Sequence, residues 1–310
     1  AFFPLYPLAV SLFAPAVGTL AAGVIVSNLF LLGALILLYR LTELEFDADS
    51  AMRTITYLVI FPTAFFFSAV YTESTFLFFA VGSFYFARRR MWAWAGLFAM
   101  LCSASRIVGL VVWVAIGLEF LISHGWQMAL LRRPRSMRSF LHSVLHDRLG
   151  IAALTLPPLG VMSYMAFLAM RFGDPVAFST VQSAWGRELV GPIELLRRDL
   201  TGLMGGDWLA GDIWWHVPLD VGAYLAALLL SVAVWRRLGA PYAVFVVLSI
   251  LLPSASGTGS IARYVVVLFP IFMLLGAWGR RAWLDRGLTI SFALLLGVFA
   301  TAFVNWVFVA

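Results

Sequence analysis

The feature that most constrains this chain is a succession of apolar runs, each bounded by arginines or by a short polar segment. A membrane-spanning helix needs ~20 mostly apolar residues, so a chain of this length with short loops has room for about ten of them. Runs shorter than ~17 residues must extend into their flanks or be shielded by neighbouring helices. We predict spans at 17–39, 54–70, 75–87, 91–103, 107–123, 150–170, 218–235, 240–253, 261–279 and 288–309.

Composition excludes a water-soluble globule. Hydrophobic residues make up 63% of the 310 residues and charged residues only 12%, against about 45–50% and about 25% in soluble domains. The single cysteine, Cys102, lies in an apolar run and excludes both a disulfide framework and a cysteine-ligated metal. We therefore expect one all-α, polytopic integral membrane domain over residues 1–310.

The arginines favour an even number of spans. All 21 basic residues are arginine, and basic residues concentrate in cytoplasmic loops. With ten alternating spans, 15 arginines fall on one side: Arg40, Arg53, Arg88, Arg89, Arg90, Arg132, Arg133, Arg135, Arg138, Arg148, Arg236, Arg237, Arg280, Arg281 and Arg286. The other side holds six: Arg106, Arg171, Arg187, Arg197, Arg198 and Arg263. The first side is therefore predicted to be cytoplasmic.

This topology gathers the unexplained polar segments on the outer face. They are the opening AFFPLYP, residues 71–74 and 103–106, the long loop 171–217 and the segment 254–264. The basic stretch 132–148 falls on the inner face and is predicted to be a surface helix near anionic lipid. The excess of basic over acidic residues therefore indicates membrane topology, and we expect no nucleic-acid partner.

Glu73 and Arg106 interrupt apolar sequence at the predicted outer surface. A charge at that depth is costly unless it is paired or functional. Glu73 either caps the helix that begins near Ser74 or serves as a functional acid. Arg106 either pairs with Glu73 or another acid, or binds phosphate through the bidentate fork of its guanidinium.

The outer loop 171–217, which we expect to contain short helices, begins with a Gly-Asp-Pro turn at Asp174. Phe178, Gln182 and Trp185 follow at helical spacing, and Arg187 lies close behind. These side chains suit a sugar phosphate, through ring stacking and hydroxyl hydrogen bonds. They equally suit an amphipathic helix lying on the bilayer surface.

Metal and cofactor signals are weak. Asp207, Asp212 and His216 could hold a cation but match no metal-ligand spacing, and His142 and His146 lack the glutamate of a zinc motif. The sequence contains no phosphate-binding Gly-Lys-Ser/Thr loop, dinucleotide fingerprint or Gly-x-Ser-x-Gly elbow. It implies no certain cofactor, and a divalent cation is compatible but unsupported.

Five segments, in order, resemble bacterial members of the PIG-V mannosyltransferase family. They are AFFPLYP at 1–7, FPTAFFFSAVYTES at 61–74, SASRIVG at 103–109, RFGDPVAFSTVQSAWGRE at 171–188 and SIARYVVVLFP at 260–270. That family includes the second mannosyltransferase of glycosylphosphatidylinositol-anchor assembly. The resemblance implies a GT-C type glycosyltransferase, a polytopic helical bundle with its active site on the extracytoplasmic face.

The resemblance also implies the reaction and its partners. Mannose would pass, with inversion and in an α-1,6-like linkage, from a polyprenyl-phosphate donor to a glycolipid, glycan or protein acceptor. The location would be the bacterial plasma membrane, or the endoplasmic reticulum of a eukaryote, in contact with membrane lipids.

Site roles follow from matching motif positions. Glu73 is the expected supporting acid, and Arg106 and Arg263 are expected to bind the donor phosphate. The expected sugar or acceptor contacts are Tyr71, Asp174, Gln182, Trp185, Arg187 and Tyr264. Family members carry their main base, an aspartate, in a first outer loop before the FFPLYP motif. The resemblance therefore places that base and a first helix upstream of residue 1.

Two other functions remain open from the sequence. One is transfer of another polyprenyl-phosphate-linked sugar, such as arabinose or glucose. The other is a lipid or sugar transporter or flippase, although transporters tend to place polar residues near the bilayer midplane and to show internal repeats. Here the unusual polar residues cluster on one predicted face.

Overall fold

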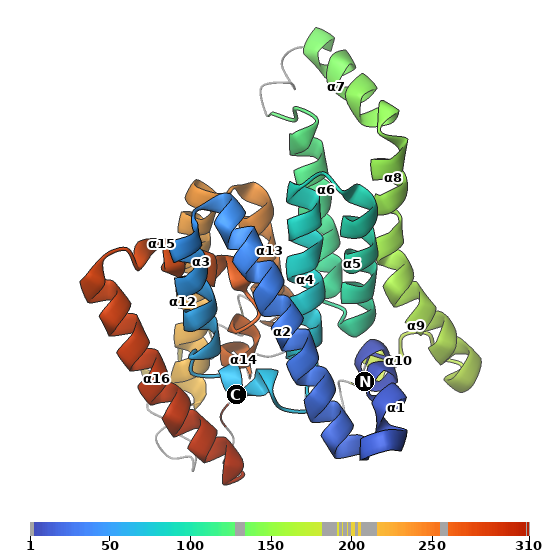
Figure 1. Ribbon diagram of the computed structural model, residues 1–310. Helices are drawn as coiled ribbons and strands as arrows, with labels where there is room; N and C mark the ends of the chain where they lie inside the picture. Colours follow the sequence, from blue (N-terminus) through green and yellow to red (C-terminus); the bar gives the residue numbers. More distant parts are fainter. Residues whose placement is uncertain are drawn as a thin grey trace.

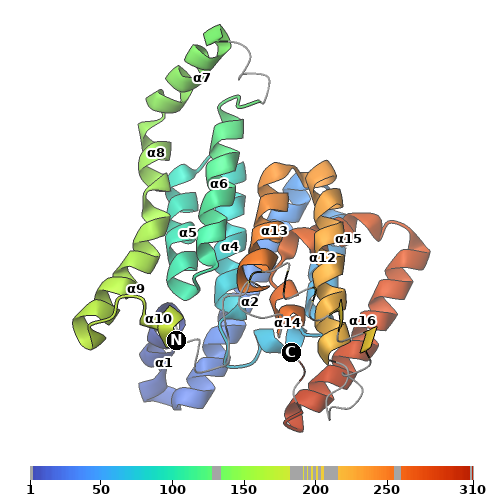
Figure 2. The same cartoon turned by 180° about the vertical axis from the view of Figure 1, so that it is seen from behind.

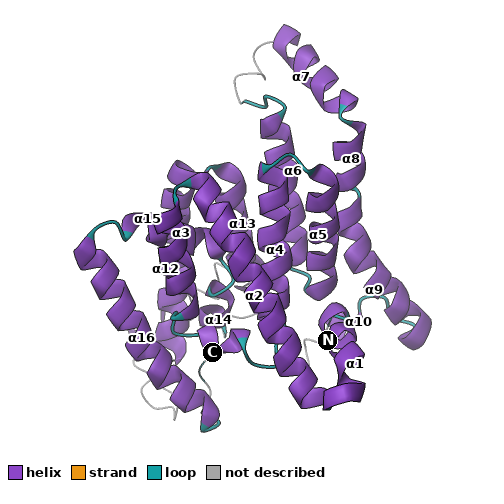
Figure 3. Cartoon of the chain, viewed as in Figure 1, coloured by secondary structure: helices purple, strands orange, loops and turns teal. Residues whose placement is uncertain are grey.

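The computed structural model describes residues 3–127, 134–181, 216–254 and 260–307, with Val309 and isolated positions between 191 and 205. Within those ranges every regular element is helical, and Figure 3 shows no strand. The expected all-α polytopic fold is therefore confirmed. The first helices are α1 (Leu5–Val17), α2 (Thr19–Glu45), α3 (Ala48–Val59), the 3-10 turn η1 (Ala64–Phe67), α4 (Glu73–Arg88), α5 (Trp92–Ser105) and α6 (Gly109–Ser123).

The second half of the chain continues the bundle. Its helices are α7 (Pro134–His146), α8 (Arg148–Leu154), α9 (Leu156–Phe172), α10 (Ala177–Thr180), α12 (His216–Leu238), α13 (Ala240–Ser254), α14 (Ile261–Val265), α15 (Phe269–Trp278) and α16 (Ala282–Val304). Helix α2 crosses between two groups of helices, with α4, α5, α6, α8 and α9 on one side and α3, α12, α13, α15 and α16 on the other (Figure 1). Both views place α1, α10 and α14 at one end of the bundle and α7 at the opposite end (Figures 1 and 2).

In the described part of the chain, four helical segments are long and apolar enough to cross a membrane: Thr19–Glu45, the α8–α9 segment Arg148–Phe172, Pro218–Leu238 and Ala282–Val304. Shorter apolar helices stand at four of the other predicted spans, as expected for segments shielded by their neighbours: Trp92–Ser105, Gly109–Ser123, Ala240–Ser254 and Phe269–Trp278. These helices make the chain an integral membrane protein.

Two predicted spans are broken rather than continuous. The span predicted at 54–70 ends as α3 at Val59, and the chain then turns through η1. The span predicted at 261–279 divides into α14 and α15. A proline lies at each break, Pro62 in the first and Pro270 at the start of α15. Proline lacks an N–H and disfavours helical geometry in the residue before it, so helices end there.

Helix α1 was not predicted. Tyr6 ties it to α2, since its hydroxyl donates to the carbonyl of Gly23 at 3.0 Å and lies 2.8 Å from Ser27 Oγ. Gly18, at φ 81°, makes the turn that separates the two helices. Leu8 and Leu12 on the other face of α1 are exposed.

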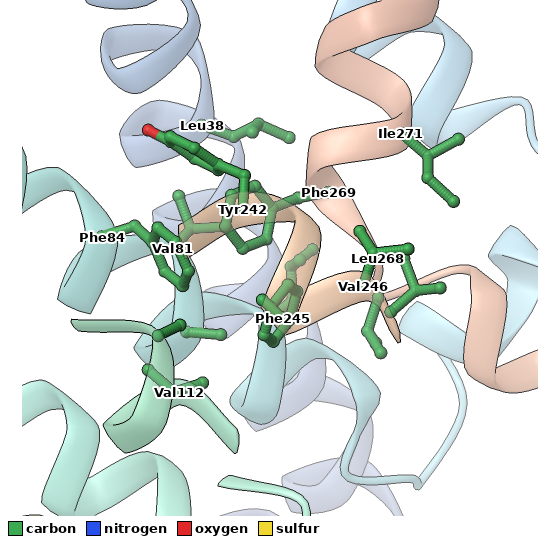
Figure 4. Close-up of a cluster of buried hydrophobic side chains, with 14 of the residues drawn as sticks. Leu38, Val81, Phe84, Val112, Tyr242, Phe245, Val246, Leu268, Phe269 and Ile271 are labelled. Atoms are coloured by element: carbon green, nitrogen blue, oxygen red, sulfur yellow. The ribbon is translucent and has the colours of Figure 1, made fainter. Parts of the chain in front are cut away.

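The core packs aromatic rings where three helices meet. Phe84 of α4 contacts Tyr242 and Phe245 of α13 and Phe269 of α15, with ring centroids 4.9, 5.5 and 5.2 Å away (Figure 4). All four side chains are fully buried or nearly so. Burying such rings removes 150–250 Å² of surface each and contributes roughly 0.5–1.5 kcal/mol per ring pair beyond area burial. In a membrane this packing, rather than water exclusion, holds helices together.

Small residues set the closest helix approaches. A Cβ on Gly160 of α9 would lie 2.2 Å from the carbonyl oxygen of Met100 in α5 and 2.2 Å from Ser103 Oγ. We predict that Gly160→Ala destabilises the protein by about 1–3 kcal/mol, because the backbone of α5 must move. Thermal unfolding in detergent measures this.

The matched control is Gly297→Ala on α16, where an added Cβ meets nothing within 4 Å. Because alanine favours a helix over glycine by about 1 kcal/mol, this variant should be neutral or more stable. Equal melting temperatures for the two variants would contradict the packing of α9 on α5.

Asp47 caps α3 at the end of the bundle opposite α14. Its carboxylate accepts from the Ser50 amide at 2.8 Å and pairs with Arg280 between α15 and α16. The Ser50 amide first, and then Arg280, lower the pKa of Asp47 to about 2. A lowered carboxylate pKa adds stability above its unfolded value, about 3.9, that is lost as pH falls through the native value.

We predict that Asp47→Ala lowers the melting temperature by about 1–3 °C at pH 7, the loss typical of a helix cap. The difference should shrink between pH 4 and pH 2, where the parent protein protonates the same carboxylate. Melting curves across that range test it, with the exposed Asp49→Ala in the same turn as control. A difference that persists undiminished at pH 2 would exclude a contribution from the charge.

Candidate functional site

A buried carboxylate shared by two arginines forms the centre of the candidate site. Glu73 is the first residue of α4, and its side chain is 0% exposed. Its Oε1 accepts a hydrogen bond from Arg106 Nη2 at 3.2 Å and lies 3.4 Å from Arg263 Nε. The arginine side chains are 19% and 16% exposed. Three segments that are far apart in the sequence thus meet at one carboxylate.

Local backbone geometry positions the two arginines of the site. Arg106 follows the last residue of α5 in an extended conformation, φ −158° and ψ 148°, at the turn into α6. That turn is tight, because a Cβ on Gly109 would lie 2.4 Å from the backbone nitrogen of Ser103. Arg263 and Tyr264 lie on the short helix α14, which the proline break separates from α15.

Aromatic rings surround the guanidinium of Arg263. Its Cζ lies 5.4 Å from the ring centroid of Phe66, 5.5 Å from Tyr71 and 5.2 Å from Tyr264. The Cζ of Arg106 lies 5.4 Å from the same Tyr264 ring. A cation within ~6 Å of an aromatic face is attracted by the ring quadrupole, by ~2 kcal/mol or more when desolvated. The rings therefore hold the arginines in place without neutralising them.

The charges at this site do not balance. Among the described residues, the guanidinium groups of Arg106 and Arg263 share one carboxylate, Glu73, whose single negative charge cannot neutralise both. Among the described residues, Glu73 Oε2 and Arg263 Nε are buried and have no hydrogen-bond partner. Buried polar groups are nearly always paired, and an unpaired one often marks a site completed by a ligand or a water molecule. These two unpaired atoms and the two arginines make this the candidate functional site of the described residues.

The structure brings together five of the residues that the sequence singled out: Tyr71, Glu73, Arg106, Arg263 and Tyr264. The structure also shows the alternative for Arg106, which pairs with Glu73. The alternative for Glu73 was wrong: Glu73 is the first residue of α4, but no side-chain hydrogen bond caps that helix. These contacts do not exclude a functional role, because the carboxylate cannot neutralise both arginines. Phe66 was missed, since nothing distinguishes it from its phenylalanine neighbours in the sequence.

Of the outer-loop residues that the sequence singled out, the structure describes only some, and these are held in local contacts. Asp174 follows α9, and its carboxylate accepts from the Val176 amide at 2.9 Å and the Thr180 hydroxyl at 2.8 Å, so it stabilises the start of α10. Phe178 packs on Phe3 and Tyr164. The other loop residues named from the sequence lie outside the described residues: Gln182, Trp185, Arg187, Asp207 and Asp212. In the described part of the chain, no group of three metal-ligating side chains comes together.

A second ionic cluster, missed from the sequence, lies at the opposite end of α4. Arg88 donates to Glu119 of α6 at 2.8 Å and pairs with Glu45 of α2, and the Tyr242 hydroxyl of α13 donates to Glu45 at 2.9 Å. Glu119 could have been noticed, since it is a lone charge in the apolar run of α6. This cluster joins four helices and has two carboxylates to one arginine.

The charge imbalance predicts an unusual order of stabilities. Glu73→Gln should destabilise the protein by about 3 kcal/mol or more, because it leaves two buried arginines without a counter-charge. Arg106→Gln should cost clearly less, because Glu73 and Arg263 then form a balanced pair. Thermal unfolding of both variants tests the order, with the exposed Arg40→Gln at the far end as control. An Arg106→Gln variant as unstable as Glu73→Gln would show that the pair is a purely structural ion bridge.

Comparison with known proteins identifies the fold. No family model matches the sequence, and no curated protein matches it. Among solved structures, the chain resembles ArnT from Cupriavidus metallidurans bound to undecaprenyl phosphate, with a TM-score of 0.58 and 13% sequence identity. The match covers 90% of this chain and 50% of that chain, so this chain spans about half the length of ArnT. The chain therefore has the GT-C membrane fold of ArnT, as the sequence resemblance led us to expect.

Proposed function

We propose that this chain is a membrane glycosyltransferase that uses a polyprenyl-phosphate-linked sugar as its donor. The observation that carries the proposal is the positively charged Glu73–Arg106–Arg263 site, in a fold shared with a protein whose structure holds undecaprenyl phosphate. Mannose is the proposed sugar, on the strength of the five ordered segments that resemble the PIG-V family. A glycolipid, glycan or protein hydroxyl is the proposed acceptor, and the transfer inverts the anomeric centre.

The excess positive charge suits this chemistry. When the acceptor oxygen attacks the anomeric carbon, the bond from that carbon to the phosphate oxygen breaks and the acceptor proton passes to a base. The phosphodiester, with one negative charge, leaves as a phosphomonoester with up to two. A fixed cationic site binds the departing phosphate more strongly than the intact donor. It therefore stabilises the transition state more than the ground state.

The proposed roles follow from the geometry. Arg106 and Arg263 bind the phosphate, with Arg263 Nε offering an unused buried donor. Glu73 acts as the supporting acid by holding both guanidinium groups at one point. Tyr71 and Tyr264 line the approach to Arg263. Asp174, Gln182, Trp185 and Arg187 remain proposed sugar or acceptor contacts, on their motif positions alone.

The arginine distribution supports an extracytoplasmic site. The end of the bundle that carries Arg106 and Arg263 is predicted to hold few arginines, whereas Arg40, Arg88 and Arg280 lie at the other end. The arginine-rich end is the expected cytoplasmic side. A polyprenyl-phosphate donor would then present its sugar to the outer face.

One observation favours a second function. The breaks between α3 and η1 and between α14 and α15 lie next to the site, and transporters often bind substrates at discontinuous helices. A polyprenyl-phosphate-sugar flippase would use the same two arginines to hold the phosphate. The experiment below distinguishes it from the transferase.

The test reconstitutes the full-length protein in vesicles with polyprenyl-phosphate radiolabelled mannose and a lipid extract from the source organism. We expect label in a new product, and Arg106→Ala should reduce transfer by about 10²–10³-fold, the loss typical of one transition-state donor. Arg40→Ala, an exposed arginine at the far end, is the control and should retain activity. Normal turnover by Arg106→Ala would overturn the phosphate assignment. Label that crosses the bilayer unchanged would support the flippase.

A further inference from the structure

Asp220 is a buried carboxylate that the site description has not used. It lies on α12 and is 3% exposed. Its Oδ2 accepts from the backbone amide of Ser260 at 3.0 Å, and its Oδ1 accepts from the amide of Ala262 at 2.7 Å. Each oxygen thus binds one amide at the entrance to α14. Hydrogen bonds to a charged group are stronger than those between neutral groups, so this contact is strong for its size.

The backbone at this point needs such an anion. Ser260 has φ 75° and ψ 15°, a left-handed conformation that is unfavourable for a residue other than glycine. Left-handed and right-handed residues in succession turn their amides toward one concave point, where an anion binds. Asp220 supplies that anion from within the protein and so stabilises the strained turn.

Helix α14 depends on contacts from outside itself. It has only five residues, and isolated helices shorter than ~12 residues are not stable. Asp220 fixes its first amides, while the Thr63 hydroxyl near η1 donates to the Ala262 carbonyl at 3.1 Å. Arg263 and Tyr264 come directly after Ala262, so the direction of both side chains follows from these bonds.

We infer that Asp220 is a positioning residue that sets the orientation of Arg263 and Tyr264 toward Glu73. The inference rests on the proposed function for its consequence in donor binding, but the structural part stands on the hydrogen bonds alone. The two carboxylate oxygens of Asp220 bind backbone amides, so Asp220 acts through α14. An asparagine at this position would offer one oxygen acceptor where the carboxylate offers two.

The first experiment measures amide hydrogen exchange in the peptide that contains residues 260–266, in detergent or nanodiscs and without donor. We expect exchange to be at least about tenfold faster in Asp220→Ala, with Asp220→Asn intermediate, while the melting temperature shows that both remain folded. Asp285→Ala is the matched control, because it removes a carboxylate that accepts a hydrogen bond from Tyr57 of α3, far from α14. Unchanged protection in Asp220→Ala would overturn the inference, whatever the protein's activity.

The second experiment is a double-mutant cycle on the binding of undecaprenyl phosphate to the protein in nanodiscs. We expect Asp220→Ala to weaken binding about tenfold in the parent protein and to add little in an Arg263→Gln background, because it acts through Arg263. An equal loss in both backgrounds would show a general structural effect and overturn the inference. If the parent protein binds no polyprenyl phosphate, the proposed function fails, while the exchange experiment still decides whether Asp220 orders α14.

Discussion

The fold depends on Glu73, a single buried carboxylate that must serve two arginines. A charge in an apolar bundle is costly unless it is paired, so the end of α5, the start of α4 and the short helix α14 must meet at one point. Among the described residues, Glu73 is the carboxylate that both arginines share at this point. The requirement that brings these segments together is also the basis of the proposed phosphate site.

Helix α4 connects this site to the rest of the molecule. It begins with Glu73 and ends with Arg88, so its terminal charges also complement the helix dipole. Arg88 is held by two carboxylates, whereas Glu73 is held by two arginines. The far cluster joins α2, α4, α6 and α13 and leaves no excess of cations. One end of α4 is thus joined to three other helices through Arg88, and the other end carries Glu73 between Arg106 and Arg263.

The broken helices explain how polar groups reach the site. Pro62 follows the end of α3, and Pro270 lies in the first turn of α15. The chain therefore forms η1 as a separate short element after α3, and α14 as a separate short helix before α15. Irregular backbone at membrane depth is tolerated where protein buries it or where it lines a cavity. Asp220 and Thr63 satisfy backbone groups of α14 in this way. The break is therefore stabilised by partners from α12 and from the segment before η1.

The sequence by itself determined the class of protein, the positions of most apolar helices and the identity of most residues now seen at the site, but it missed α1 and the breaks in two predicted spans. Apolar run length and arginine placement are local properties, so they can be read without knowing the packing. Only the tertiary structure decided that Glu73 is shared by two arginines, that Phe66 joins the aromatic ring around Arg263 and that Asp220 holds α14. Those contacts join residues up to 197 positions apart, as in the contact of Phe66 with Arg263. Hydropathy does not predict contacts between residues so far apart in the sequence. Which helices pack together depends on the shapes of side chains along their whole length.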